Sequence, residues 1–119
     1  MISMAGKSYT WHLLTTDPAL LPWQDNGIAV AEAGGKKLCV AKHRGMYQAF
    51  AYSCPHAGGI MANGWIDALG NVVCPLHRYR FDIMKGRNTS GEGYHLKTYP
   101  MRMDETGLHV GIDVPGIFG

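Results

Sequence analysis

Two short loops decide the fold of this chain: Cys54-Pro55-His56-Ala57-Gly58-Gly59 and Cys74-Pro75-Leu76-His77-Arg78-Tyr79-Arg80-Phe81. Each loop offers a thiol and an imidazole close together, and in each a proline directly follows the cysteine. The seventeen residues 57–73 that separate His56 from Cys74 are enough for one β-hairpin, over 64–73, so the loops can lie side by side at one end of a sheet. Two cysteines and two histidines brought together in this way form a four-ligand metal site.

The spacing of the ligands bears on which metal such a site holds. Tetrahedral zinc accepts two cysteines and two histidines, but its usual spacing places the cysteines in one loop and the histidines in the other. Here each loop supplies one of each kind, with a single residue between Cys54 and His56. That division suits two irons, one held by both cysteines and the other by both histidines. A structural zinc site remains the alternative.

At these residues the sequence resembles the Rieske family, whose signature is Cys-x-His, a spacer of about this length, and Cys-x-x-His. Beyond the ligands, the similarity includes both prolines and four further residues: Gly58, Leu76, Phe81 and Asp82. It extends along the chain from Tyr9 to Asp113. The resemblance implies one [2Fe–2S] cluster per chain, with these cofactor-binding and metal-ligating residues: Cys54, His56, Cys74 and His77. It also implies an antiparallel β base with a small cluster-binding lobe, about residues 52–82, at its tip.

Several positions depart from the high-potential members of the family. Those members carry an additional cysteine in each loop, joined as a disulfide, where Gly59 and Leu76 stand here. They also have a serine and a tyrosine that donate hydrogen bonds to sulfur, where this chain has Tyr79 and Phe81. Fewer donors stabilise the reduced cluster less, so we expect a reduction potential near the low end of the family's range. Arg78 stands where many relatives have glycine.

Length and composition favour one all-β domain over 1–119. A chain of 119 residues is large enough for one core but not for two. Its 16 glycines are about twice the usual share of roughly 7%, so the chain turns often. Alternating or apolar runs bounded by turn residues predict eight or nine short strands, as in a sandwich or barrel. The predicted strands are 9–14, 27–33, 36–43, 46–52, 64–67, 71–74, 79–83, 94–103 and 108–112.

Charge and hydropathy indicate which partners and which cellular location to expect. The net charge of +2 comes from scattered basic residues, which does not indicate a nucleic-acid partner. No apolar run approaches the roughly 18 residues that a membrane-spanning helix needs. Residues 1–7 lack the basic and apolar segments of a signal peptide. We therefore expect a cytoplasmic protein without a membrane partner.

The remaining cysteine and histidines carry no motif. Cys39 lies in the apolar run Leu38-Cys39-Val40-Ala41, where a lone cysteine is most often an inert core residue. An odd number of thiols fits a reducing compartment. The other four histidines lie in strand-like or turn segments and are interpreted as ordinary side chains: His12, His43, His95 and His109.

The resemblance, together with the length of the chain, implies a function. Rieske oxygenases add a second domain with a mononuclear iron, and 119 residues leave no space for one. The sequence is therefore most similar to stand-alone Rieske ferredoxins. These electron-transfer components of dioxygenase systems pass single electrons from a flavin-dependent reductase to a terminal oxygenase, without a substrate site of their own. The alternative from another class is the small subunit of an assimilatory nitrite reductase. Some members of that group lose the ligands, so the four present here favour the carrier.

Overall fold

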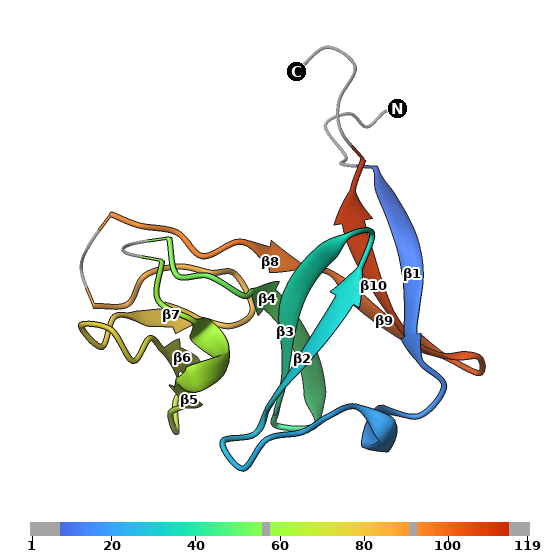
Figure 1. The fold of residues 1–119 in the computed structure, drawn as a ribbon, viewed down its shortest axis with the longest axis horizontal. Coiled ribbons are helices and arrows are strands. Elements are labelled where there is room, and N and C mark those ends of the chain that lie inside the picture. The colour runs from blue at the N-terminus through green and yellow to red at the C-terminus, as the bar shows by residue number, and fades with distance from the viewer. Residues whose placement is uncertain (1–7, 56–57, 91–92, 115–119) are drawn as a thin grey trace.

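In the computed structural model, residues 8–55, 58–90 and 93–114 are described, and they form ten short strands in three antiparallel sheets. Figure 1 shows a base of two sheets and a smaller lobe beside it. The first base sheet has the order β1 (Tyr9–Thr15), β10 (Gly107–Asp113), β9 (Met101–Asp104). The second has the order β2 (Ile28–Ala33), β3 (Lys36–His43), β4 (Met46–Ala51), β8 (Thr98–Tyr99). The lobe sheet consists of β5 (Trp65–Ile66), β6 (Asn71–Val73) and β7 (Arg80–Asp82).

Strand β3 is buried on both of its faces, which explains its unbroken apolar run. Side chains alternate between the two faces of a strand. Leu38 and Val40 pack in the core between the two base sheets, whereas Cys39 and Ala41 pack in the core that the base shares with the lobe. All four are fully buried. The second base sheet is therefore a central layer, covered by the first sheet on one side and by the lobe on the other.

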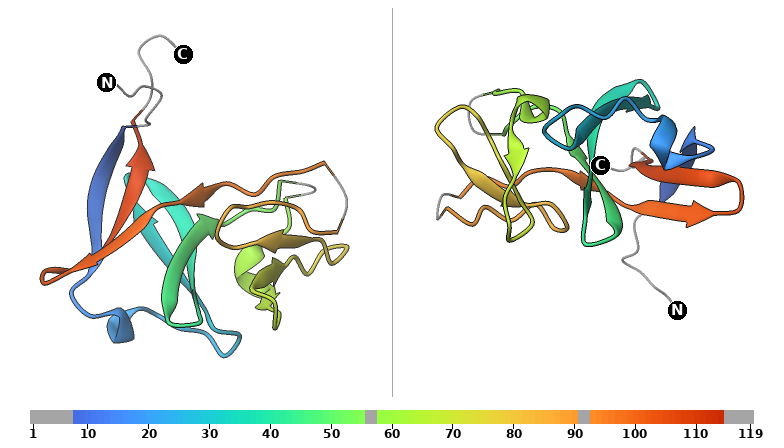
Figure 2. Two further views of the ribbon diagram at one scale, coloured as in Figure 1. Left: turned by 180° about the vertical axis from the view of Figure 1, so that it is seen from behind. Right: turned by 90° about the horizontal axis from the view of Figure 1, so that it is seen from below.

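The small lobe, defined as residues 52–97, is inserted between two neighbouring strands of the base. Strand β4 leads into it and β8 leads out of it, and the two pair antiparallel, with Phe50 opposite Thr98. Figure 2 shows the two strands side by side where the lobe joins the base, one running into the lobe and the other returning from it. The interior of the lobe holds both loop cysteines and a set of large apolar side chains: Met61, Val72, Phe81, Ile83 and Leu96.

Side-chain amides of the base fasten the lobe at a second point. Residues 24–26 precede β2, and Met61–Asn63 forms the 3₁₀ turn η2 at the near side of the lobe. The amide of Asn26 donates to the carbonyl oxygens of Ala62 and Gly64, both at 2.8 Å. That of Gln24 donates to the carbonyl of Ala62 at 2.9 Å. These contacts satisfy carbonyls that the short turn leaves without partners of its own.

The all-β architecture with antiparallel sheets is confirmed, and most predicted strands begin and end within one or two residues of the observed ones. The prediction of a single strand over 94–103 is wrong, because the strand there is divided into β8 and β9 at Pro100. Proline has no N–H to donate and interrupts a ladder of strand hydrogen bonds. The predicted hairpin over 64–73 is present but has shorter strands. No helix in the described part of the chain is long and apolar enough to cross a membrane.

Candidate metal centre

Backbone hydrogen bonds close the first loop directly after β4. The N–H of Cys54 donates to the carbonyl of Gly59 at 2.7 Å, and the N–H of Gly58 donates to the carbonyl of Cys54 at 3.0 Å. Gly58 adopts a left-handed conformation, with φ of 73°, which glycine reaches without steric cost. These two hydrogen bonds fix the start of the loop, at Cys54. The predicted ligand His56 lies outside the described residues.

The second loop is a tight turn that begins at the end of β6. The N–H of Cys74 donates to the carbonyl of Tyr79 at 2.8 Å, which closes the turn. His77 and Arg78, inside it, have φ of 66° and 58°. Left-handed backbone costs a non-glycine residue roughly 1–2 kcal/mol. Such strain persists only where surrounding structure imposes it, and it is concentrated at functional sites.

A third segment supports the second loop from the side. Residues 87–90 run along β7: the N–H of Thr89 donates to the carbonyl of Arg80 at 2.8 Å, and the N–H of Arg80 donates to Oγ of Ser90 at 2.7 Å. The N–H of Asp82 donates to the carbonyl of Arg87 at 2.8 Å. Strand β7, which follows the loop, is thus hydrogen-bonded on both edges, to β6 on one side and to residues 87–90 on the other.

The two loop cysteines lie together inside the lobe. Their exposed fractions are 3% for Cys54 and 0% for Cys74, and both thiols are free. Burial raises the pKa of Cys74 to about 11; the N–H of Leu76 acts against this, and the neighbouring Cys54 thiol adds to it. A metal ion reverses such a shift, because it binds the thiolate and releases the proton. A Cβ on Gly59 would lie 2.9 Å from Sγ of Cys74, so the glycine backbone forms one wall beside this sulfur.

The histidine side of the centre is only partly described. His77 is exposed, in the second loop between Cys74 and Tyr79. Within the described ranges, no three side chains of His, Cys, Asp or Glu are grouped closely enough to hold a metal ion. The structure therefore brings together Cys54 and Cys74 and does not place His77 in one group with them. The paired sulfurs and the glycine wall fit an iron–sulfur group, and the full set of four ligands stays a prediction.

The structure brings a second tyrosine, Tyr94, to Tyr79 of the second loop, and no motif revealed its position. The ring centroids of His77 and Tyr79 are 6.4 Å apart, and those of Tyr79 and Tyr94 are 6.0 Å apart. Tyr94 lies fifteen positions after Tyr79 in the sequence, so only the fold brings it here. Phe81, two residues after Tyr79, is fully buried in the lobe core.

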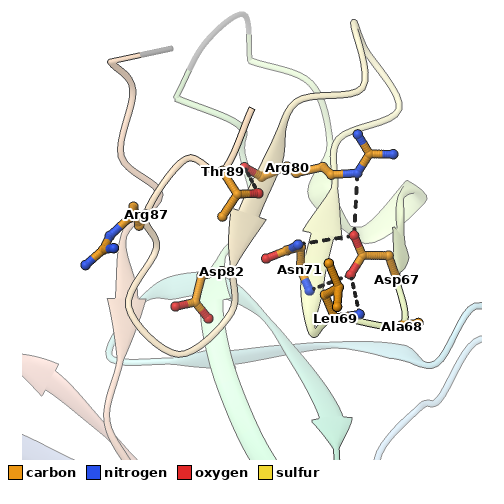
Figure 3. Close-up of a pocket in the computed structure, with 8 residues that line it drawn as sticks. All are labelled: Asp67, Ala68, Leu69, Asn71, Arg80, Asp82, Arg87 and Thr89. Carbon is orange, nitrogen blue, oxygen red and sulfur yellow. Dashed lines mark hydrogen bonds and ion pairs between the residues drawn. The ribbon is translucent and has the colours of Figure 1, made fainter. Parts of the chain in front are cut away.

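A shallow depression on the side of the lobe is lined by polar residues that stabilise a turn. Figure 3 shows Asp67, Asn71 and Arg80 directed toward one another across it. Nε of Arg80 lies 3.4 Å from Oδ2 of Asp67, and Oδ1 of Asp67 accepts the N–H groups of Leu69 and Asn71. Burial alone would raise the pKa of Asp67, but hydrogen bonds from Asn71 and Leu69 and the charge of Arg80 lower it overall. These contacts close the turn between β5 and β6.

The histidines interpreted as ordinary side chains lie elsewhere. His109 is on β10, where its Nε2 lies 2.7 Å from Oγ1 of Thr106 and 3.2 Å from Oδ1 of Asp104. Hydrogen bonds from Thr106, with a smaller effect of His109, lower the pKa of Asp104 to about 2. This polar group stabilises the turn between β9 and β10, in the base. His43 ends β3, and its ring lies against Gly70.

Taken together, the fold and the centre define a class of protein. Two Cys-Pro loops meet at the end of a small β lobe, their thiols are buried close together, and the second loop carries an exposed histidine. Such an arrangement is typical of a small β protein that carries an iron–sulfur cluster near its surface.

Comparison with known proteins identifies the family. The family model described as Rieske [2Fe-2S] domain matches residues 14–100. The ferredoxin component of the naphthalene 1,2-dioxygenase system of Pseudomonas aeruginosa is 32% identical over 81 residues, which cover 67% of this chain and 75% of that protein. The chain belongs to the Rieske [2Fe–2S] family, and its cofactor is a [2Fe–2S] cluster.

Solved structures show the same fold. The ferredoxin of carbazole 1,9a-dioxygenase from Nocardioides aromaticivorans IC177 superposes with a TM-score of 0.70 at 21% identity, over 87% of this chain and 96% of that one. A protein described as an NADH-dependent nitrite reductase small subunit of Mycobacterium tuberculosis superposes with a TM-score of 0.73 at 19% identity, again over 87% and 96%. At these identities the likeness concerns the fold, which both of the functional classes considered above share.

Proposed function

We propose that this chain is a one-electron carrier, the ferredoxin component of an oxygenase system, and that it works in the cytoplasm. The observation that carries the proposal is the pair of buried thiols from two loops, the second of which also carries the exposed His77, in a chain whose relatives are ferredoxin components. Those relatives serve alkene monooxygenase and naphthalene 1,2-dioxygenase systems. The odd number of cysteines supports a reducing compartment.

The residues have distinct roles in this proposal. Cys54 and Cys74 would hold one iron, and His56 and His77 would hold the other. When bound, the cluster supplies one-electron redox chemistry. Burial of the two cysteines keeps water away from the sulfurs, while the exposed imidazole of His77 gives a partner protein its nearest approach.

The end of the lobe also suits brief contact with redox partners, a flavin-dependent reductase and a terminal oxygenase. Ile60 and Leu76 are 37% and 40% exposed there, and both flank the loops. Arg78 adds an exposed positive charge, whereas Arg80 is already paired with Asp67. An apolar rim with a cation favours rapid association with an acidic partner surface, because charge raises the association rate more than the affinity.

The cofactor is tested by analysing anaerobically purified protein. We expect two irons and two acid-labile sulfides per chain and a visible absorption spectrum. His77→Ala should lose the cluster, because one iron would lack a ligand. Stoichiometric zinc without sulfide in the wild type would refute the proposed function in favour of a structural zinc protein.

The carrier role is tested by measuring electron transfer from a reductase and to an oxygenase over a series of salt concentrations. Arg78→Glu should slow the reaction at low salt, and added salt should slow the wild type. Arg44→Glu is the matched control: Arg44 is also exposed, and it also has left-handed backbone, with φ of 53°, but it lies in the β3–β4 turn of the base. Equal rates for the two variants and the wild type, with the cluster intact, would show that charge at this end does not steer docking.

A further inference from the structure

Three aromatic rings lie in series from the second loop to the surface of the lobe. The imidazole of His77 and the ring of Tyr79 have centroids 6.4 Å apart and planes inclined by 52°. The rings of Tyr79 and Tyr94 have centroids 6.0 Å apart and planes inclined by 35°. Both separations fall within the range of about 4.5–7 Å in which aromatic rings attract one another. Tyr79 is the middle member of the series.

Tyr79 is fixed through both its backbone and its side chain. Its carbonyl accepts the N–H of Cys74 at 2.8 Å, which ties its backbone to the start of the loop. Its side chain is partly buried and packs against the lobe core. His77, by contrast, is exposed and lies in a left-handed turn with Arg78, outside any strand. An exposed side chain on such a turn samples several rotamers unless a neighbour restricts it.

We infer that Tyr79 is a positioning residue for His77, and that Tyr94 supports it from the far side. The inference rests on the proposed function, since it takes His77 to be a ligand of the cluster. Its acting group is the aromatic ring of Tyr79, which narrows the set of orientations open to the imidazole of His77. An imidazole restricted in advance loses less rotamer freedom when it binds iron, so iron is held longer.

The ring and the hydroxyl of Tyr79 can be separated by two substitutions. Tyr79→Leu removes the ring but keeps an apolar side chain against the lobe core, whereas Tyr79→Phe keeps the ring and removes only the hydroxyl. We expect Tyr79→Leu to release iron to a chelator faster than the wild type by a factor of roughly two to ten, the range that one aromatic pair contributes. Tyr79→Phe should restore the rate of the wild type.

A spectroscopic measurement separates positioning from general stability. Pulsed electron paramagnetic resonance of the reduced, cluster-loaded protein measures the nitrogen couplings of the ligating imidazoles, which depend on ring orientation. Tyr79→Leu should change the couplings of one imidazole and leave the other unchanged, and Tyr79→Phe should change neither. Tyr47→Leu is the control, because it removes a ring pair of similar spacing, 6.2 Å from Trp23, in the base. It should lower stability without altering the couplings.

Tyr94→Leu provides a second variant should Tyr79→Leu fail to fold. It leaves Tyr79 in place and should change iron release and the couplings in the same direction, by a smaller amount. Couplings and release rates equal to those of the wild type in both leucine variants would overturn the inference, as would a Tyr79→Phe protein that behaves like Tyr79→Leu. A wild-type protein that holds no iron and sulfide would instead refute the proposed function, and the positioning role with it.

Discussion

The backbone of Gly59 lies directly against the sulfur of Cys74. A Cβ at Gly59 would be 2.9 Å from Sγ of Cys74 and 3.1 Å from Cβ of Leu76. Carbon and sulfur atoms that are not bonded to each other do not approach so closely without displacement. The first loop therefore packs on the second at a point where only a hydrogen atom fits, and this contact fixes the distance between the two loops.

The first prediction follows from this contact. Gly59→Ala should lower the iron and sulfide content per chain, because the added methyl group displaces the Cys74 sulfur from its position in the pair. Gly93→Ala is a suitable control, since Gly93 is also in the lobe, has ordinary backbone, and no atom of the described residues lies within 4 Å of its Cβ position. If Gly59→Ala is loaded as fully as Gly93→Ala, the contact does not constrain the centre.

A second prediction compares two glycines with the same backbone conformation. Gly86 and Gly35 have φ of 78° and 79°. A Cβ at Gly86 would overlap the carbonyl oxygen of Leu96, whereas no atom lies within 4 Å of the Cβ position at Gly35. Gly35→Ala should therefore cost only the backbone strain, roughly 1–2 kcal/mol of unfolding free energy.

Gly86→Ala should cost more, by about 2 kcal/mol or above, because the lobe must also shift to relieve the overlap. Urea unfolding followed by circular dichroism measures both values. Similar losses in the two variants would mean that strain alone determines the cost, and that the segments around Gly86 and Leu96 separate easily.

The third prediction concerns the cysteine outside the loops. Burial raises the pKa of Cys39 to about 12, so its thiol stays protonated, and unreactive toward alkylating reagents, at pH 8. Cys39→Ala should leave the visible spectrum unchanged and lower the unfolding free energy by about 1 kcal/mol through lost packing. Loss of iron from this variant would contradict the assignment of the ligands to the two loops.

The fourth prediction concerns the reduction potential. Phe81 is fully buried in the same core as both loop cysteines, and it cannot donate a hydrogen bond to sulfur. The midpoint potential should therefore lie near the low end of the Rieske range, roughly −150 mV rather than +300 mV. Phe81→Tyr should raise the potential if the new hydroxyl donates to a sulfur. A strongly positive midpoint for the wild type in protein-film voltammetry would disprove this explanation.

The features that the sequence predicts well are those that depend on neighbouring residues. The turns at Gly34-Gly35 and Arg44-Gly45 determine the hairpins β2–β3 and β3–β4, because left-handed residues there match the twist of paired strands. The adjacency of Cys54 and Cys74 follows from the short hairpin between them. The division at Pro100 was not predicted, although the sequence holds a signal for it, since proline cannot donate to a strand ladder.

Other features depend on contacts between distant parts of the chain and have no signal in the sequence. The position of Tyr94 beside Tyr79 depends on how residues 83–97 return along the lobe. The contact of Gly59 with Cys74 depends on the exact separation of the two loops. A glycine in a loop sequence does not predict such a contact, because glycine occurs in loops for many reasons. The ligand assignment lies between these cases: the structure pairs the cysteines, and the two histidines stay a prediction.

The antiparallel pairing of β4 with β8 has a consequence for how this protein can change. Because these two strands are neighbours, the lobe leaves and re-enters the base at points only about 4.8 Å apart. An insertion whose ends nearly meet can be exchanged or shortened without redirecting the strands that hold it. We therefore expect residues 52–97 to be transferable as a unit to another sheet. A recipient sheet would need two adjacent antiparallel strands and small side chains, like those of Cys39 and Ala41, on the face that this unit covers.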